Sequence, residues 1–311
     1  MPITLADAKQ LSQDKLTNYV IDEFRKSPLL DAMVFDNTVK PQGGESMTYT
    51  YNRVSTLPTA ATRAINSEYT PQEAKTKQVT VNLAVFGGSF QIDRVIAEHE
   101  KQVIADLVQF QLAQKTQATR ALFCDQFING NSAGSTNQFD GLDKAIKGSS
   151  TDLTIAEALD LSTPAKIKEN AGALRYYMRK LIAKMDGAPT LAIMSRDMFA
   201  VMQSVADEST GYTATRGDLG ETLLKYGSTT LMDIGDKPGS SDSIISSNDI
   251  YFVRIGLDGV HAVSPSGGGL VKTYLPNFSE PGAVKTGEVE MVAAMALKAT
   301  RSAAVLRGIN I

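Results

Sequence analysis

The sequence is poor in the residues that most often carry covalent or metal chemistry: it has no tryptophan, one cysteine and two histidines among 311 residues. A single cysteine, Cys124, excludes an internal disulfide, and its place in an apolar helical segment predicts a small buried side chain. The two histidines, His99 and His261, are far apart and have no partner four residues away. The spacing of a zinc protease site is therefore absent.

Long apolar runs and blocks of like charge are also missing. No stretch approaches the roughly 20 apolar residues of a membrane-spanning helix. The N-terminal MPITLADAKQ lacks a basic segment followed by an apolar core, so we expect an unexported, cytoplasmic chain. The 31 basic and 34 acidic residues are dispersed and give a net charge of -3. This distribution predicts no electrostatic footprint for sequence-specific nucleic-acid binding.

Motifs for catalysis are absent too. The glycine run at 267–269 lacks the Lys-Ser/Thr of a phosphate loop and is interpreted as a linker. No G-x-S-x-G elbow occurs. The tripeptide Arg216-Gly217-Asp218 fits a loop turn better than an adhesion motif, and paired acids such as Glu98 and Glu100 fit a solvated helix face. We therefore expect no catalytic residue, no cofactor and no metal site.

The feature that organises the chain is the stretch at 93–128, which contains neither glycine nor proline and is rich in helix formers. Asp93 is placed to cap its first turn, and Asn129-Gly130 to end it. A helix of this length spans about 50 Å, so it predicts a spine. Its broad apolar face comprises Ile96, Val103, Ile104, Leu107, Val108, Phe110 and Leu112.

The segment before the spine predicts an arm and a hairpin. Residues 5–26 have helical periodicity, and residues 29–39 are apolar but irregular, as in an arm that lies along another surface. Residues 47–51 and 79–85 alternate with the period of two expected of strands, with Gly87-Gly88 predicted to break the second strand.

The connection between these two strands, at 55–77, is polar and too long for a structureless loop inside a compact domain. An isolated two-stranded ribbon is also marginally stable in water. Both difficulties are resolved if the hairpin projects and is held by another copy of the protein. The alternative is a hairpin folded back on its own domain.

After the spine, a loop rich in Gly, Ser and Asn leads to a mixed α/β region at 151–265. Thr163 caps a helix at 164–185 and Ser195 caps a second helix. Residues 211–220 predict a flexible loop and 223–224 a short helix. Strands are predicted at 189–194, 231–234, 249–255 and 260–263, the last two joined by a turn at Asp258-Gly259, and the segment 288–307 is expected to pack on the spine.

The order of these elements resembles a major capsid protein of tailed bacteriophages. The resemblance is carried by TVNLAVFGGSFQIDR at the return strand, by NGNSAG and FDGLDKAI after the spine, and by VEMVAAMALKATRSAAVLRGI at the end. It implies an α+β fold of the Hong Kong 97 type. The implied ranges are an N-terminal arm at 1–42, an extended hairpin loop at 43–92, a peripheral domain with the spine at 93–150 and 266–311, and an axial domain at 151–265.

The resemblance also implies a structural role: self-assembly as hexamers and pentamers into an icosahedral shell around double-stranded phage DNA, which it contacts non-specifically. The implied location is the virion capsid, assembled in the cytoplasm of a bacterial host, and the implied partners are a portal protein, a separate scaffolding protein and a decoration protein. Some members of the family cross-link a hairpin lysine to an asparagine of the peripheral domain. The residues of this chain in comparable places are Lys75, Lys77 and Asn277, but we expect no cross-link here. The candidate assembly residues are Leu57, Arg63, Tyr69, Lys75, Lys77, Arg94 and Arg216.

Three alternatives remain open. An encapsulin, a cellular compartment built on the same fold, would need an inner pocket for cargo peptides. An α/β enzyme would use the mixed lobe and would show turnover that a single carboxylate substitution abolishes. A phage tail or fibre subunit would form tubes or trimers in place of closed shells.

Overall fold

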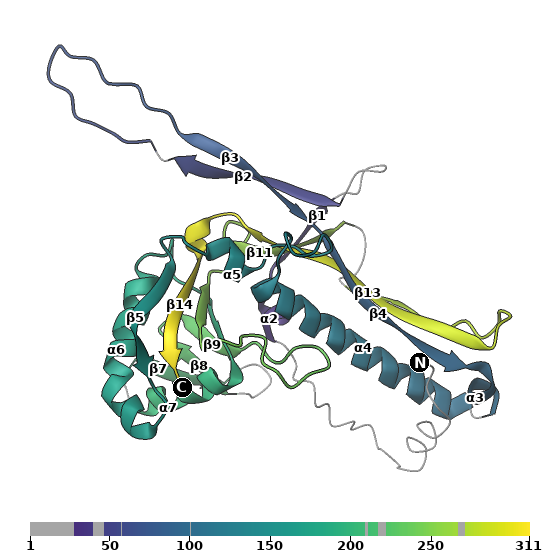
Figure 1. The fold of residues 1–311 in the computed structure, drawn as a ribbon. Helices are drawn as coiled ribbons and strands as arrows, with labels where there is room; N and C mark the ends of the chain where they lie inside the picture. Colours follow the sequence, from purple (N-terminus) through teal and green to yellow (C-terminus); the bar gives the residue numbers. More distant parts are fainter. Residues whose placement is uncertain are drawn as a thin grey trace.

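The computed structural model describes residues 28–39, 47–56, 58–99, 101–208, 211–216, 222–266 and 271–311. The helix predicted at 5–26 and the linker at 267–269 lie outside these residues. The described chain forms two sheets with a long helix against them, and a two-stranded ribbon extends away from the body (Figure 1). None of the described helices is both long and apolar enough to cross a membrane.

One sheet has seven strands and forms the core of a compact lobe. Its strands alternate between two buried faces: Leu191 and Ile193 face the long helix, whereas Met194 faces the helices on the other side. Those helices are α6 (Pro164–Ile182) and α7 (Arg196–Asp207), whose predicted caps Thr163 and Ser195 accept backbone hydrogen bonds. In spatial order the strands are β5 (Asp152–Asp160), β14 (Ala303–Asn310), β10 (Ile250–Val253), β6 (Leu191–Met194), β9 (Thr229–Asp233), β8 (Thr222–Tyr226) and β7 (Tyr212–Arg216).

Two predictions for this lobe are wrong. The loop expected at 211–220 contains β7, and the helix expected at 223–224 is β8, which pairs with β7 from Tyr212 opposite Tyr226 to Arg216 opposite Thr222. The tyrosine and threonine residues of both segments favour strands, and pairing with β9 gives them a sheet to join. Two adjacent leucines carry no period, so they did not distinguish helix from strand.

The second sheet is built around β13 (Val284–Leu297). Its first ten residues pair with β4 (Ala84–Asp93) on one edge. On its other edge, β13 pairs first with β12 (Val271–Tyr274) and then, toward its C-terminal end, with β11 (Val260–Pro265). β1 (Phe35–Val39) lies parallel to β11 and completes the sheet. The segment 29–39, predicted as an arm, therefore divides in two: β1 lies along the edge of the sheet, whereas Leu29, Leu30 and Met33 are buried in the core.

The sheets divide the chain differently from the predicted ranges. β11 falls within the range predicted as axial, yet it pairs with β13. β14 falls within the range predicted as peripheral, yet it pairs with β5 and β10 inside the seven-stranded sheet. The reason is burial on both faces of β14: Ala303 and Val305 face one core, and Ala304 and Leu306 face the other.

The prediction that Gly87-Gly88 ends a strand is also wrong, because β4 continues through both glycines. A side chain at Gly87 would collide with the carbonyl oxygen of Val289 on β13, and one at Gly287 would collide with the ring of Phe90. These glycines allow two backbones to approach closely within a continuous sheet.

The spine begins where β4 ends. β4 extends to Asp93 and is followed by α3 (Arg94–His99) and α4 (Lys101–Asn129), the described parts of the segment 93–128 that was predicted to be helical. The pairing of Asp93 with Val284 and the bond from the Arg94 amide to the Ala283 carbonyl hold the start of α3 to the end of the sheet. Asp93 caps as predicted, since its Oδ1 accepts from the amide of Val95 at 2.8 Å.

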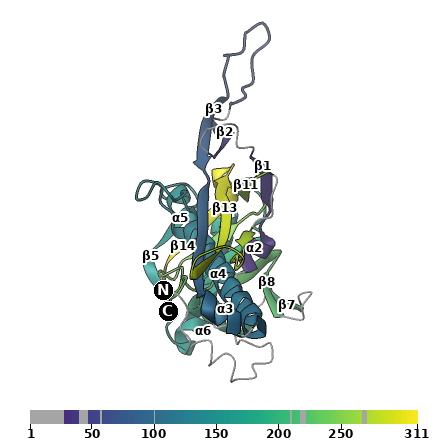
Figure 2. The same ribbon diagram turned by 90° about the vertical axis from the view of Figure 1, so that its right-hand side faces the viewer.

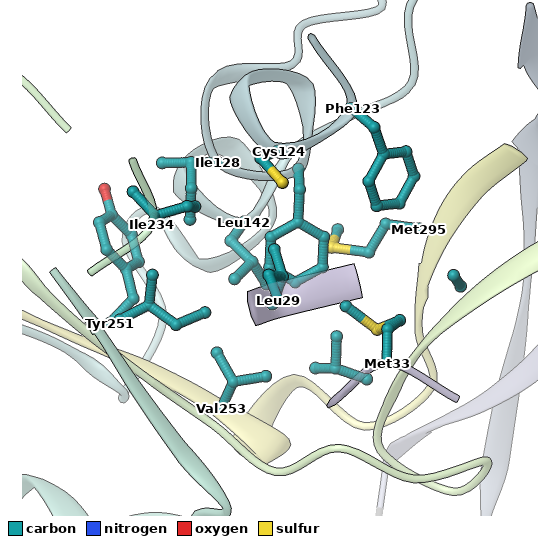
Figure 3. Packing of buried hydrophobic residues seen from close by; sticks show 14 of the residues in the cluster. Leu29, Met33, Phe123, Cys124, Ile128, Leu142, Ile234, Tyr251, Val253 and Met295 are labelled. Atoms are coloured by element: carbon teal, nitrogen blue, oxygen red, sulfur yellow. The ribbon is translucent and has the colours of Figure 1, made fainter. Parts of the chain in front are cut away.

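The main core lies where α4 meets both sheets (Figure 3). α2 (Pro28–Ala32) inserts Leu29 between α4 and the strands, and α5 (Leu142–Ile146) closes the core from the loop side. Cys124 is fully buried there, as predicted from its apolar neighbours. The core side chains labelled in Figure 3 are Leu29, Met33, Phe123, Cys124, Ile128, Leu142, Ile234, Tyr251, Val253 and Met295.

Arg307 links the seven-stranded sheet to α5, the short helix in the segment after α4. Arg307 on β14 donates to Asp143 of α5 at 2.5 Å, to Asp152 of β5 at 2.9 Å and to Asp249 before β10 at 2.9 Å. Burial raises the pKa of Asp249, and Arg307 acts in the opposite direction. These contacts fix the C-terminal strand in the sheet.

Candidate assembly site

The projecting ribbon is the candidate site, because it leaves the body and offers its length to other molecules. It consists of β2 (Thr48–Thr56) and β3 (Lys75–Asn82), paired antiparallel from Thr48 opposite Asn82 to Thr56 opposite Lys75. The described residues beyond the strands, 58–74, contain no strand or helix and are all exposed. Two views at right angles show the ribbon pointing away from both sheets (Figures 1 and 2). The prediction of a projecting hairpin is confirmed.

Continuity with the second sheet sets the direction of the ribbon. Only Leu83 separates the end of β3 from the start of β4, and its amide donates to the Met47 carbonyl at 2.9 Å. The strand that returns from the tip thus runs almost directly into the sheet on which α4 packs. A force on the ribbon is therefore transmitted to the body through backbone hydrogen bonds.

Two side chains of β2 fasten the root of the ribbon to the end of β13. The phenol of Tyr51, which is buried, donates to the Leu297 carbonyl at 2.8 Å. Arg53 also donates to the Leu297 carbonyl and reaches Thr300 Oγ1 at 3.2 Å. The Arg53 Nη2 that donates to the Leu297 carbonyl also donates to the Tyr51 phenol at 3.2 Å, so the two side chains support each other.

Tyr49 makes a second attachment two residues earlier on the same face of β2. Its phenol donates to Asp36 of β1 at 3.1 Å, and the ammonium group of Lys298 lies 5.9 Å from its ring centroid. Burial raises the pKa of Tyr49, while Lys298 opposes this shift. The alternation of Tyr49, Tyr51 and Arg53 therefore places three anchors on the body side of one strand.

His261 lies beneath these anchors. Its imidazole is fully buried, and within the described part of the chain neither ring nitrogen has a partner that meets full hydrogen-bond geometry. The ring meets Tyr49 edge-on at a centroid distance of 5.9 Å. Burial lowers the pKa of His261, the positive charge of Lys298 lowers it further, and Asp36 opposes the change. The buried imidazole therefore fills space at the root of the ribbon in surroundings that disfavour its charged form.

The tip of the ribbon is ordered by its own side chains. The Arg63 guanidinium lies 5.3 Å from the centroid of the Tyr69 ring and donates to the carbonyl oxygen of Ser67 at 3.1 Å. Asn66 has a positive φ of 69°, which makes the chain reverse. Ile65 beside it is 91% exposed.

A groove of about 230 Å³ separates the ribbon root from the loop that follows α4. Val79 and Val81 of β3 form one side, with Phe139 and Asp140 of the loop opposite. Asp140 accepts from Ser132 and from Lys144 at 2.7 Å, and these bonds lower its pKa against the effect of burial. The loop side is thereby fixed in spite of its small polar residues.

The predicted assembly residues do not form one cluster. Arg63 and Tyr69 meet at the tip, and Lys75 and Lys77 are exposed at the start of β3. Arg94 lies at the opposite end of β4, and Arg216 ends β7 in the other sheet. Leu57 lies outside the described residues. Sequence reasoning missed Tyr51, Arg53 and His261 as root contacts, although the alternation along β2 was a usable signal for the first two.

Within the described residues, no group of three or more His, Cys, Asp or Glu side chains could hold a metal ion. The arrangement at the ribbon consists of anchors, an organised tip and exposed strand edges. Such a surface suits binding between protein chains.

No protein-family model matches the sequence, and no curated protein matches it. Solved structures are similar over the whole chain. The holo-SrpI encapsulin complex from Synechococcus elongatus PCC 7942 superposes with a TM-score of 0.60 at 11% identity, covering 100% of this chain and 97% of that chain. The capsid of Myoviridae Phage XM1 gives 0.59 at 8% identity, covering 93% and 94%. Microbacterium phage Oxtober96 gives 0.57 at 16% identity, covering 99% of both chains.

The similarity covers 93 to 100% of this chain. These neighbours are shell and phage structures, and identities of 8 to 16% show the fold alone. The chain therefore has the Hong Kong 97-like capsid fold.

Proposed function

We propose that this protein is the major capsid protein of a tailed bacteriophage and assembles, as hexamers and pentamers, into an icosahedral shell around double-stranded DNA. The observation that carries the proposal is the ribbon, whose described residues 58–74 are all exposed while its root is fastened by Tyr51 and Arg53. A rigidly rooted ribbon with an exposed tip has a use only if a neighbour receives it.

In this proposal the second sheet with α4 forms the peripheral domain and the seven-stranded lobe forms the axial domain. The boundary follows the sheets, so β11 belongs to the peripheral domain and β14 to the axial domain. Residues 1–42 serve as the arm. Of the range 43–92 predicted as the extended loop, the part up to residue 83 serves as that loop, whereas β4 belongs to the peripheral domain. Portal, scaffolding and decoration proteins are the expected partners, and Leu57, Arg63, Tyr69, Lys75, Lys77, Arg94 and Arg216 are the proposed assembly residues.

The experiment is to express the full chain, purify it and examine it by analytical ultracentrifugation and electron microscopy. Closed shells with five-fold and six-fold clusters are the expected result. A monodisperse monomer at high concentration, with or without a co-expressed scaffolding protein, would overturn the proposal. Tubes or trimers would indicate the tail or fibre role.

An encapsulin-type compartment is the second candidate, favoured by the similarity to the holo-SrpI encapsulin complex over 100% of this chain. The contents of purified shells separate the two functions. A co-purifying protein whose short terminal peptide is sufficient to load other proteins indicates a compartment. Shells that need a portal protein to fill with DNA indicate a capsid.

A further inference from the structure

Helix α6 concentrates positive charge in a chain that is acidic as a whole. Residues 164–184 contain six basic residues and one acidic residue, whereas the complete chain has a net charge of -3. The buried face of α6 consists of apolar side chains such as Leu174, Met178 and Leu181. The basic residues consequently lie on the faces of the helix that are directed away from the core.

The fold adds a further cation to the C-terminal half of this helix. Arg301, in the 3-10 turn η1 (Thr300–Ser302), donates from Nε to the Lys184 carbonyl at 2.8 Å. Asp186 follows Lys184, and its amide donates to the Arg301 carbonyl. We use the name α6 patch for the five residues Arg175, Arg179, Lys180, Lys184 and Arg301.

Two members of the α6 patch are held by aromatic neighbours. Arg179 Nε donates to the Tyr226 phenol at 2.9 Å, and Lys180 lies 5.9 Å from the centroid of the Tyr176 ring. Tyr226 is itself packed against Tyr212, with ring centroids 5.0 Å apart. A guanidinium oriented in this way loses less side-chain entropy when it binds a ligand.

The surface beside the α6 patch leaves room for a ligand. A hollow of about 330 Å³ lies next to Arg179, between the end of α6 and the turn formed by Gly227 and Ser228. Gly172 and Ala183 are exposed on the same helix, and a side chain at Gly172 would meet nothing within 4 Å. A polymer backbone can therefore approach α6 closely.

We propose that the α6 patch binds the phosphate backbone of nucleic acid without reading its sequence. From Arg175 to Lys184 the helix and its last turn rise about 14 Å, a length of duplex axis over which one strand presents about four phosphates, at about 3.4 Å of axial rise each. Arginine presents planar paired donors that fit phosphate oxygens, and lysine adds point charge. The binding is electrostatic and therefore falls with salt.

The test measures binding of a 30-base-pair duplex to the full-length protein by fluorescence anisotropy between 50 and 300 mM NaCl. The variant Lys180→Gln with Lys184→Gln should lower the slope of log K against log salt by about 2 and weaken binding about tenfold or more at low salt. The matched control, Lys147→Gln with Lys272→Gln, removes two exposed lysines elsewhere and should leave both values within twofold of the unmodified protein.

Equal loss in the α6 and control pairs would overturn the proposal, since binding would then follow net charge alone. Polyglutamate that displaces the duplex at equal charge concentration would also overturn it and would identify an acidic protein segment as the partner. Circular dichroism verifies that each variant is folded. The duplex assay can be made on free subunits and on shells, so its result does not depend on the capsid function. Shell formation is measured separately by ultracentrifugation, which distinguishes failure of this proposal from failure of the proposed function.

Discussion

The phenol of Tyr51 on the projecting ribbon donates a hydrogen bond of 2.8 Å to the carbonyl oxygen of Leu297, the last residue of β13. The two residues are 246 positions apart in the chain, so the root of the ribbon is fixed by the closing strand of the sheet. Arg53 donates to the same oxygen. The direction of the ribbon is thus a property of the completed fold.

Replacement of Tyr51 by Phe should lower the free energy of unfolding by about 0.5 to 1.5 kcal/mol, because one buried hydrogen bond is lost. The loss stays moderate, since Arg53 still satisfies the Leu297 carbonyl. Urea unfolding measures it. Tyr176→Phe, at an exposed position on α6, is the control and should change stability by less than about 0.5 kcal/mol. An effect of Tyr51→Phe no larger than that of the control would show that the root bond contributes nothing.

Removal of the ribbon tip should separate folding from assembly. The described residues at 58–74 are all exposed, so deletion of residues 57–76 removes almost no buried surface. We expect a soluble protein with the circular dichroism spectrum of the full chain that forms no shells in electron micrographs. Ala61→Ser at the same exposed loop should assemble normally. Normal particles from the deletion variant would mean that the ribbon is not a contact between subunits.

Substitution of Gly87 by Ala should destabilise the protein, because the added carbon collides with the Val289 carbonyl in the paired strand. Overpacking of this kind costs about 1 to 3 kcal/mol. Gly172→Ala is the opposite case: the position is exposed within a helix, and alanine there should stabilise by up to about 1 kcal/mol. Thermal unfolding of both variants checks the signs. A stable Gly87→Ala protein would contradict the close approach of β4 and β13.

Gly87 also illustrates how far sequence can predict this fold. Alternation of apolar and polar residues identified β2 and β3, and the caps Thr163 and Ser195 fixed two helix starts, because these signals are local. Whether a glycine pair ends a strand or lies within it depends on β13, about 200 residues later in the chain. No local pattern carries that information.

The place of β14 was hidden for a related reason. Its sequence, AAVLRGIN, reads as one more small-residue strand at the end of the chain, and only pairing with β10 and β5 assigns it to the seven-stranded sheet. For the candidate site, Arg63 and Tyr69 were named from the sequence as assembly residues, but their contact with each other, like the root contacts to Leu297 and His261, needed tertiary structure.

Acid should weaken the root of the ribbon through His261. Burial and the charge of Lys298 lower the pKa of this imidazole in the folded chain, whereas the unfolded chain retains a value near 6.5. Below about pH 6.5 the unfolded state therefore binds more protons than the folded state, so stability falls as the pH decreases toward the folded pKa. Above pH 7 both states are neutral at this residue, and the effect vanishes.

The measurement is the free energy of unfolding in urea at pH 7.5 and at pH 5.5, above the range in which most carboxylates titrate. The unmodified protein should lose stability between these values, by at most about 1.4 kcal/mol, which is the limit for a group that binds a proton only in the unfolded chain. His261→Leu should lose much less, because the titrating group is gone from both states. If His261→Leu and the unmodified protein lose the same amount, the acid sensitivity originates elsewhere, and the buried imidazole is a passive part of the ribbon root.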